Sequence, residues 1–266
     1  MEPEAVITQD AVSSAAQRVG LVPHSIVIRR LDRPAPPIEI EPNLPLYPAS
    51  MIKTPLALAT LALAADGELR LEAVFEVDPG NMTANDKPSP LLPGYRSPLS
   101  EILELAITRS DNVATNMLFD IVGRERATSI VRTRFGLANT AFHRKLSGSE
   151  PLLRDPQWDG VHRNAHTAAD AALLFELIAR DSVPFALRLR EMLGRQECNE
   201  KLSTGLYPGD RFAHKTGATD EVTHDGGILD TDSGGAYAIV VYSGLEATDA
   251  NDARFGPFMS EIRPML

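Results

Sequence analysis

A serine and a lysine three positions apart, Ser50 and Lys53, precede an apolar stretch rich in alanine and leucine, residues 55–65. If this segment is a helix, the two side chains share a face, with Cβ atoms about 5–6 Å apart. A serine hydroxyl is a poor nucleophile until a base takes its proton. A lysine can act as that base only if burial or another cation lowers its pKa. The alternative is a capping serine and a lysine that reaches solvent, and by itself the pair favours this alternative.

Two further motifs carry polar groups suited to the same chemistry. Ser-Asp-Asn at residues 110–112 falls between two predicted helices, and Lys-Thr-Gly at residues 215–217 falls on a predicted strand. Each has a structural alternative, because Ser-Asp-Asn is a good helix N-cap and Lys-Thr-Gly can simply end a strand. The three motifs in this order, on a helix start, an interhelical loop and a strand, together indicate an acyl-transfer site.

The composition is that of an ordinary globular protein with an acidic surface. The chain has 266 residues, a formal net charge of −10 and a pI near 5.1. This charge argues against nucleic acid or an anionic membrane as the main partner. The single cysteine, Cys198, excludes an intrachain disulfide and a thiolate metal cluster.

No targeting or cofactor signal stands out. Residues 1–5 lack the basic and apolar regions of a signal peptide, and residues 55–65 are too short to span a bilayer. We therefore expect a cytoplasmic protein unless a leader was removed. The histidines are scattered, and none pairs with carboxylates at metal-ligand spacing, so no metal and no cofactor is predicted. His214 and His224 are expected to support the site structurally rather than to react.

Strands are predicted near both ends of the chain, and helices between them. The predicted strands cover residues 25–31, 38–41, 212–216, 223–230 and 235–242. The predicted helices cover residues 10–19 (capped by Asp10), 50–66, 97–107, 113–122, 128–135, 167–180, 184–193 and 249–262, the last interrupted at Pro257.

The strands near the two ends of the chain can join one sheet only if the C-terminal third of the chain lies beside the N-terminal strands. This predicts an α/β (α+β) sandwich, with a five-stranded antiparallel sheet, flanking helices and an inserted all-helical lobe. We expect one catalytic domain over residues 1–266, with a sheet lobe at about 1–48 and 200–266 and a helical lobe at about 49–199. A cleft between lobes is a common place for a site. The apolar residues in 140–165 show no clear helix or strand periodicity, which predicts a loop, and a loop of this length is usually functional.

With these motifs the chain resembles the penicillin-binding protein and class A β-lactamase superfamily over nearly its whole length. The similar segments include Ser-Asp-Asn-Val-Ala-Thr-Asn at residues 110–116 and His-Lys-Thr-Gly at residues 214–217. His-Asp-Gly-Gly at residues 224–227 is similar to a subgroup of β-lactamase-like serine hydrolases. The resemblance implies a serine hydrolase that forms an acyl-enzyme with a β-lactam, a D-alanyl peptide or a related amide or ester.

For acylation, the resemblance implies that Ser50 attacks the substrate carbonyl with Lys53 as its base. Ser110 would then relay a proton to the departing nitrogen. Lys215 places a second cation in the cleft, which disfavours the charge on Lys53 and so frees it as a base.

For substrate binding, Asn112 would hold the side-chain amide, and Lys215 with the Thr216 hydroxyl would anchor a carboxylate. The N–H groups of Ser50 and of Ala218, which follows Gly217, would form an oxyanion hole. One such donor is typically worth about 3–4 kcal/mol.

One part of the pattern is missing from the long loop. Class A β-lactamases carry a glutamate there that activates the deacylating water. In this chain the corresponding position, located by its distance in sequence from Ser110, is occupied by Leu146. Glu150 comes four residues late and is a possible replacement base only if the loop has shifted. Asn164 stands where class A enzymes have an aspartate, so we expect weaker bonds and greater mobility at the loop's neck. These departures predict acylation with slow deacylation, as in a penicillin-binding protein or a slow hydrolase.

The alternatives left open are a D,D-peptidase type of penicillin-binding protein, a β-lactam-binding sensor without turnover, and a cytoplasmic esterase or amidase. Neither the physiological substrate nor the oligomeric state follows from the sequence.

Overall fold

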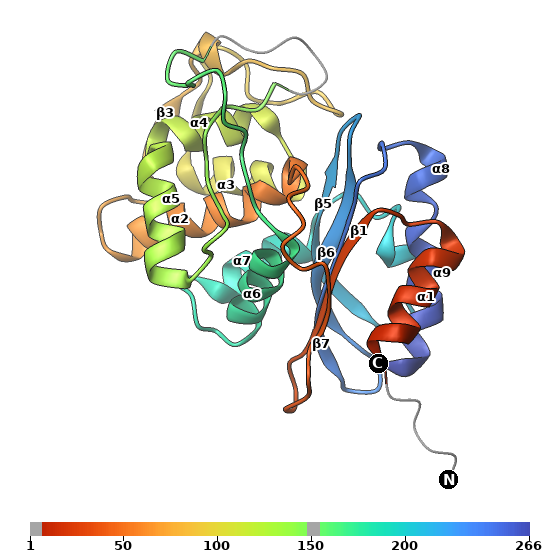
Figure 1. Cartoon of the computed structure of the whole chain (residues 1–266). Helices are drawn as coiled ribbons and strands as arrows, with labels where there is room; N and C mark the ends of the chain where they lie inside the picture. The colour runs from red at the N-terminus through yellow and green to blue at the C-terminus, as the bar shows by residue number, and fades with distance from the viewer. Residues whose placement is uncertain (1–6, 148–154) are drawn as a thin grey trace.

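A five-stranded antiparallel sheet lies at the centre of the computed structural model, which describes residues 7–147 and 155–266 (Figure 1). The strand order is β2-β1-β7-β6-β5. The strands are β1 (His24–Arg30), β2 (Ile38–Ile40), β5 (Arg211–Ala218), β6 (Thr223–Asp230) and β7 (Ala236–Ser243). Because β1 pairs with β7, strands from both ends of the chain form one sheet, and the predicted fold class is confirmed.

Helices from the two ends of the chain cover the outer face of the sheet (Figure 1). α1 (Gln9–Val19) packs against α9 (Phe255–Ile262), and α8 (Asp249–Asp252) precedes α9. Their apolar side chains share one core cluster with the outward-facing residues of β1, β6 and β7.

The remaining helices lie on the inner side of the sheet. α6 (Ala168–Ala179) contacts β1, β6 and β7, and α7 (Ala186–Gly194) contacts β5. Farther from the sheet lie α2 (Lys53–Ala65), α3 (Leu99–Thr108), α4 (Asn112–Val122) and α5 (Arg124–Phe135). The side chains of α2 from Lys53 to Leu63 are all buried, which explains why this helix is apolar on every face.

The start of the central helix differs from the prediction. Ser50 lies in a 3₁₀ turn, η1 (Ala49–Ile52), and the α-helix begins only at Lys53. Pro55 is therefore the third residue of α2, where its missing N–H costs little because the first N–H groups of a helix have no intrahelical acceptor.

Other predicted helix boundaries were also wrong, and α5 begins at Arg124 rather than at residue 128. Thr8, rather than Asp10, caps α1, since its hydroxyl accepts from Ala11 N at 3.2 Å. The C-terminal helix breaks at Ala253 and not at Pro257, which lies in the first turn of α9 where proline is tolerated.

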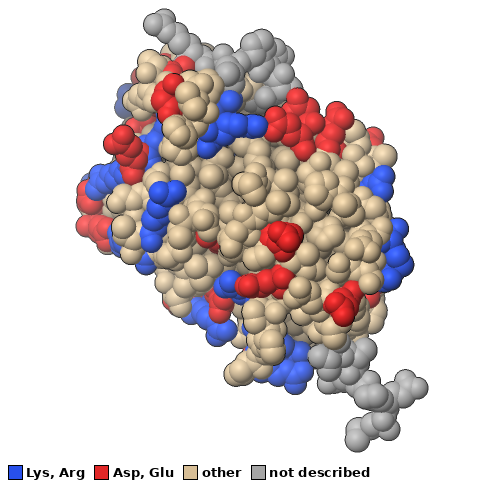
Figure 2. All heavy atoms as spheres, viewed as in Figure 1, with Lys and Arg blue, Asp and Glu red and all other residues tan. Residues whose placement is uncertain are grey.

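Short elements complete the described part of the chain. β3 (Val74–Glu76) pairs with β4 (Arg96–Pro98), and η2 (Pro79–Asn81), η3 (Leu202–Gly205) and η4 (Arg263–Met265) are 3₁₀ turns. In the view of Figure 2, uncharged residues dominate the middle of the face, and acidic and basic side chains are interspersed around it.

Candidate active site

Lys53 connects two of the three sequence motifs. It is fully buried at the first position of α2, and its Nζ donates to the carbonyl oxygen of Ser110. The same Nζ lies 2.7 Å from Asn112 Oδ1 and 3.1 Å from Ser110 Oγ. The interpretation of Lys53 as a side chain that reaches solvent is therefore excluded.

The surroundings of Lys53 disfavour its charge. Burial, and after it the neighbouring charge of Lys215, lowers the pKa of Lys53 well below the usual 10.5. A neutral amine has two hydrogens and one lone pair. It can donate both hydrogens to Ser110 O and Asn112 Oδ1 and still accept a proton.

Lys215 approaches the same hydroxyl from the sheet. Its Nζ lies 3.0 Å from Ser110 Oγ and donates to its neighbour's carbonyl, Thr216 O, at 3.0 Å. Burial lowers the pKa of Lys215 to about 8, so it keeps its proton at neutral pH. Because the charged amine only donates, the O–H of Ser110 is free to donate to Lys53. Ser110 thus lies between the two amines with one hydrogen bond to each.

The turn between α3 and α4 positions Ser110. Asp111 caps α4 by accepting from Ala114 N at 2.9 Å, so the capping interpretation of Ser-Asp-Asn is correct for its middle residue. Ser110, just before the cap, has a left-handed φ of 55°, which is unfavourable for a serine and is held here by its neighbours. Asn112 is held by Asn85 Oδ1, which accepts its N–H at 2.5 Å, and by Ala84 O, which accepts from its side chain at 2.8 Å.

Ser50 lies one turn before Lys53. Its carbonyl accepts the N–H of Lys53, and the residue is half-buried. Ala49 beside it has φ 47°, so the backbone bends sharply immediately before the serine. The N–H of Ser50 lies in the first turn of η1, where no intrahelical acceptor exists.

The edge strand β5 runs beside this turn. A Cβ on Gly217 would come within 3.0 Å of Pro48 O and 3.2 Å of Ala49 Cβ, so only glycine permits this approach without a shift. Thr219 N donates to Val222 O at 2.9 Å, and the alternation of an antiparallel ladder then turns the N–H of Ala218 away from β6. Ala218 is exposed at the strand end, and Thr216 is buried between it and Lys215.

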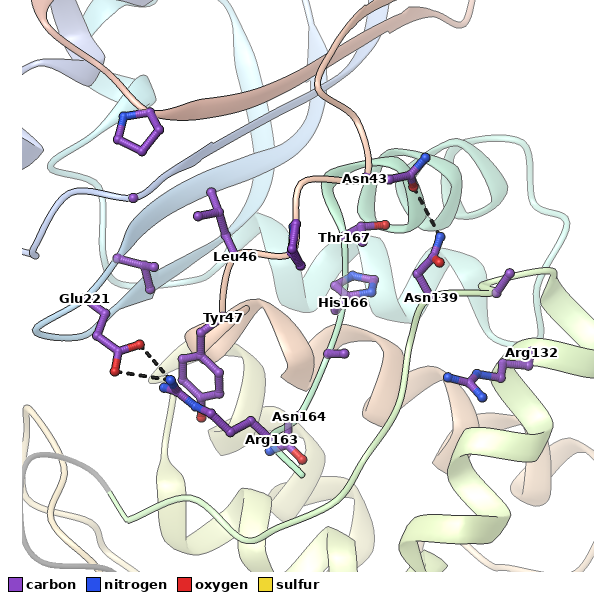
Figure 3. A pocket seen from close by; sticks show the side chains of 16 residues that line it. Asn43, Leu46, Tyr47, Arg132, Asn139, Arg163, Asn164, His166, Thr167 and Glu221 are labelled. Atoms are coloured by element: carbon purple, nitrogen blue, oxygen red, sulfur yellow. Dashed lines mark hydrogen bonds and ion pairs between the residues drawn. The ribbon is translucent and has the colours of Figure 1, made fainter. Parts of the chain in front are cut away.

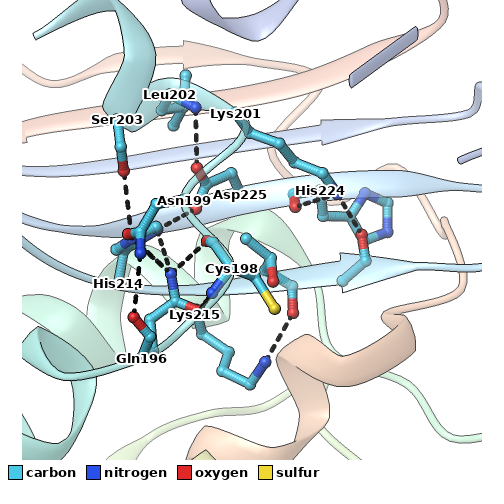
Figure 4. A network of polar contacts seen from close by, with 12 residues as sticks. Gln196, Cys198, Asn199, Lys201, Leu202, Ser203, His214, Lys215, His224 and Asp225 are labelled. Carbon is cyan, nitrogen blue, oxygen red and sulfur yellow. Dashed lines mark hydrogen bonds and ion pairs between the residues drawn. The ribbon is translucent and has the colours of Figure 1, made fainter. Parts of the chain in front are cut away.

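A buried polar network lies behind β5 and includes His214 and His224, for which a supporting role was predicted, while its other members were not predicted (Figure 4). Because alternate strand residues face opposite ways, His214 points away from Lys215. His214 Nδ1 bonds Asp225 Oδ1 at 2.7 Å, and Asp225 also accepts from Leu202 N at 3.0 Å. The buried Lys201 donates to Gly217 O and His224 O at 3.1 and 3.3 Å.

This network ties β5 to β6 and to the turn η3, so it stiffens the strands that carry Lys215 and Ala218. The available sequence signal was the pair of ionisable residues at 214 and 225 on adjacent predicted strands.

The long loop presents a different surface to the site. Leu146 N and Leu146 O are held at 2.8 and 2.9 Å by the side-chain amide of Asn116 on α4. The leucine side chain is 6% exposed and belongs to the main apolar core. Asn116 was part of the recognised motif but had no predicted role. Glu150 lies outside the described residues.

The neck of the loop is held by hydrogen bonds. The buried Asn164 accepts from His143 N and Arg144 N at 2.7 and 3.0 Å and donates to Arg144 O at 3.0 Å. Ala141 and Ala165 also pair as an isolated bridge. The predicted greater mobility of the loop stays a prediction.

Two further findings concern the described residues, 7–147 and 155–266. No helix in these ranges is long and apolar enough to cross a bilayer. Nor do three or more His, Cys, Asp or Glu side chains gather there in a way that could hold a metal ion.

Comparison with known proteins identifies the family. The model of the "Beta-lactamase enzyme family" matches residues 8–261, and the chain belongs to this family. The chain is 27% identical over 247 residues to the β-lactamase regulatory protein BlaB of Streptomyces cacaoi, covering 76% of this chain and 78% of that protein. It is 24% identical over 233 residues to the extended-spectrum β-lactamase PER-1 of Pseudomonas aeruginosa, covering 82% and 74%.

Solved structures share the fold. PBP-A superposes with a TM-score of 0.81 at 24% identity, covering 98% of this chain and 97% of that one. An ancestral class A β-lactamase superposes with a TM-score of 0.82 at 22% identity, covering 96% and 98%. The chain therefore belongs to the β-lactamase enzyme family and has the fold shared by class A β-lactamases and PBP-A.

Proposed function

We propose that this protein is a serine acyl-transferring hydrolase whose Ser50 is acylated by β-lactams or related amides and esters, and which releases the acyl group slowly. The observation that carries the proposal is the buried, deprotonation-prone Lys53 bonded to Ser110 and Asn112. As Ser110 turns its O–H from Lys53 toward the departing nitrogen, the lone pair of neutral Lys53 takes the proton of Ser50 and Oγ attacks the carbonyl.

The rest of the site has complementary roles. Ser110 passes a proton to the departing nitrogen and is replenished from the lysines bonded to it. Lys215 and Thr216 bind a substrate carboxylate, while Asn112 binds its amide. The N–H groups of Ser50 and Ala218 bind the oxyanion.

Slow release follows from the loop. A water that attacks the acyl-enzyme needs a base, and at the aligned position Leu146 offers only methyl groups, packed into the core. A leucine-to-glutamate mutant of the similar protein PBP-A is described as an acyl-enzyme complex with penicillin G, which supports a covalent adduct in proteins of this fold.

A β-lactam-responsive regulator is the second candidate, favoured by the likeness to the regulatory protein BlaB. In that case acylation happens once and the persistent adduct is the signal. A D,D-peptidase differs from both because it turns over D-alanyl peptides faster than β-lactams.

Time-resolved intact mass spectrometry distinguishes these functions. The protein is mixed with penicillin G, a chromogenic cephalosporin or a D-alanyl-D-alanine peptide, and adduct mass and product are followed together. We expect a stoichiometric β-lactam adduct that decays slowly, and none in Ser50→Ala. An adduct with no product favours the regulator, and rapid peptide turnover favours the D,D-peptidase.

The Ser50→Ala variant is the matched control because it removes one atom from a half-buried residue. Wild-type protein that gains no mass with any β-lactam or activated ester would contradict the proposal.

A further inference from the structure

A cavity of about 730 Å³ lies apart from the acylation site (Figure 3). None of Ser50, Lys53, Ser110 and Lys215 lines it. Its walls come from the segment before η1, the loop neck, α5 and the β5–β6 turn. Its size is within the range of pockets that bind small molecules.

Among the hydrogen-bond acceptors of the cavity is a ring nitrogen of His166. The ring is 2% exposed, and its Nδ1 lies 2.8 Å from Thr140 Oγ1. Thr140 donates its hydroxyl hydrogen to Asp170 Oδ2 at 2.7 Å, so it accepts the N–H of His166. This fixes the proton on Nδ1, and within the described ranges no protein group is bonded to Nε2. Burial also lowers the pKa of His166 to about 3, which keeps the ring neutral.

The cavity also presents the guanidinium of Arg132, which forms no direct ion pair in the described residues, although its charge reaches the carboxylate of Asp170 behind Thr140. Glu221, the only acid of the described lining, is paired with Arg163 at 2.8 Å at the opposite side. Arg132 donates its Nε to Thr140 O at 2.8 Å and points its remaining N–H groups toward the cavity. The guanidinium of Arg132 and the ring of His166 are thus tied to the same residue, Thr140, and both line the cavity.

The rest of the wall is largely apolar. It includes Leu46, the ring of Tyr47 and Val222, together with two prolines. A guanidinium prefers a planar carboxylate that it can bind with two parallel hydrogen bonds.

We propose that this cavity is a second binding site, separate from the acylation site, for a small carboxylic acid that also carries an O–H or N–H donor. The carboxylate binds Arg132, the donor binds His166 Nε2, and an apolar body fills the space toward Leu46 and Val222.

The probe is 3-hydroxybenzoate, titrated by calorimetry and by ¹⁵N NMR of histidine-labelled protein. We expect saturable binding with a shift of the His166 Nε2 resonance. Benzoate lacks the donor and phenol lacks the carboxylate, so each should bind about tenfold more weakly.

Matched variants test each contact. Arg132→Gln should weaken 3-hydroxybenzoate about tenfold and leave phenol unchanged, while Arg134→Gln on the same helix, paired instead with Asp66, should have no effect. His166→Phe should remove the preference for 3-hydroxybenzoate over benzoate. Ser50→Ala should bind the probe like wild type, which keeps this test independent of the acylation chemistry.

Three outcomes would overturn the proposal. These are no saturation at millimolar probe, equal binding of all three probes, and binding of inorganic phosphate as tight as that of 3-hydroxybenzoate. A folded Arg132→Gln variant with unchanged affinity for 3-hydroxybenzoate would also overturn the proposal. Because Arg132 is exposed, this variant is expected to fold.

Discussion

The two walls of the candidate site use burial in opposite ways. On one wall, burial holds two lysines around Ser110 and lowers the pKa of each, which prepares a base and a cation. On the other wall, burial removes Leu146 into the apolar core and pins its backbone with Asn116. In the proposed function, the first wall makes the acyl-enzyme, and the second offers no base at this position for breaking it.

Removing the proposed base, Lys53, should have the largest effect on acylation. Lys53→Met keeps the apolar stem and deletes the amine, and we expect acylation to slow by about 10³-fold, within the usual range for general-base catalysis. Stopped-flow labelling with a chromogenic cephalosporin measures the rate. Acylation that persists within a few-fold would assign the base to another group.

Placing a base at position 146 should test whether the loop limits deacylation. Leu146→Glu places a carboxylate at the aligned position and should accelerate deacylation about 10²-fold while acylation changes little. Leu146→Gln is the matched control, because it has nearly the same shape and no basic oxygen. Both variants lose about 2–3 kcal/mol of unfolding free energy by placing a polar group in the core. Equal deacylation rates in the two variants would show that the missing base alone does not explain slow deacylation.

The charge on Lys215 predicts a pH dependence. Its pKa is about 8, so the protonated fraction falls as pH rises through this value. For a carboxylate-bearing substrate, acylation should therefore fall about tenfold from pH 7 to pH 9. In Lys215→Arg the decline should disappear, because guanidinium keeps its charge across this range. An unchanged alkaline limb in Lys215→Arg would show that another group titrates.

The loop neck offers the smallest effects. Asn164→Ala leaves buried backbone groups unpaired and should cost about 2–3 kcal/mol of unfolding free energy. Arg163→Ala breaks a solvent-exposed pair with Glu221 and should cost less than about 1 kcal/mol. Urea denaturation measures both, and equal losses would contradict the assignment of the neck to Asn164.

Much of the fold followed from local pattern. The capped helix after Thr167 and all five strands were predicted within a few residues, because period and turn residues are local properties. The errors lie at helix ends, where competition between nearby caps decides. Thr8 displaced Asp10, and Pro257 was accommodated within a first turn.

The sequence by itself determined the order of the motifs, the fold class and the absence of a glutamate at position 146, since these depend on residue types and spacing. Only the tertiary structure decided that Lys53 is buried against Ser110, that Asn116 holds Leu146, and that Asp225 supports His214 behind β5. These contacts join residues far apart in the chain, and pKa shifts depend on the solvent and charges around a group in space.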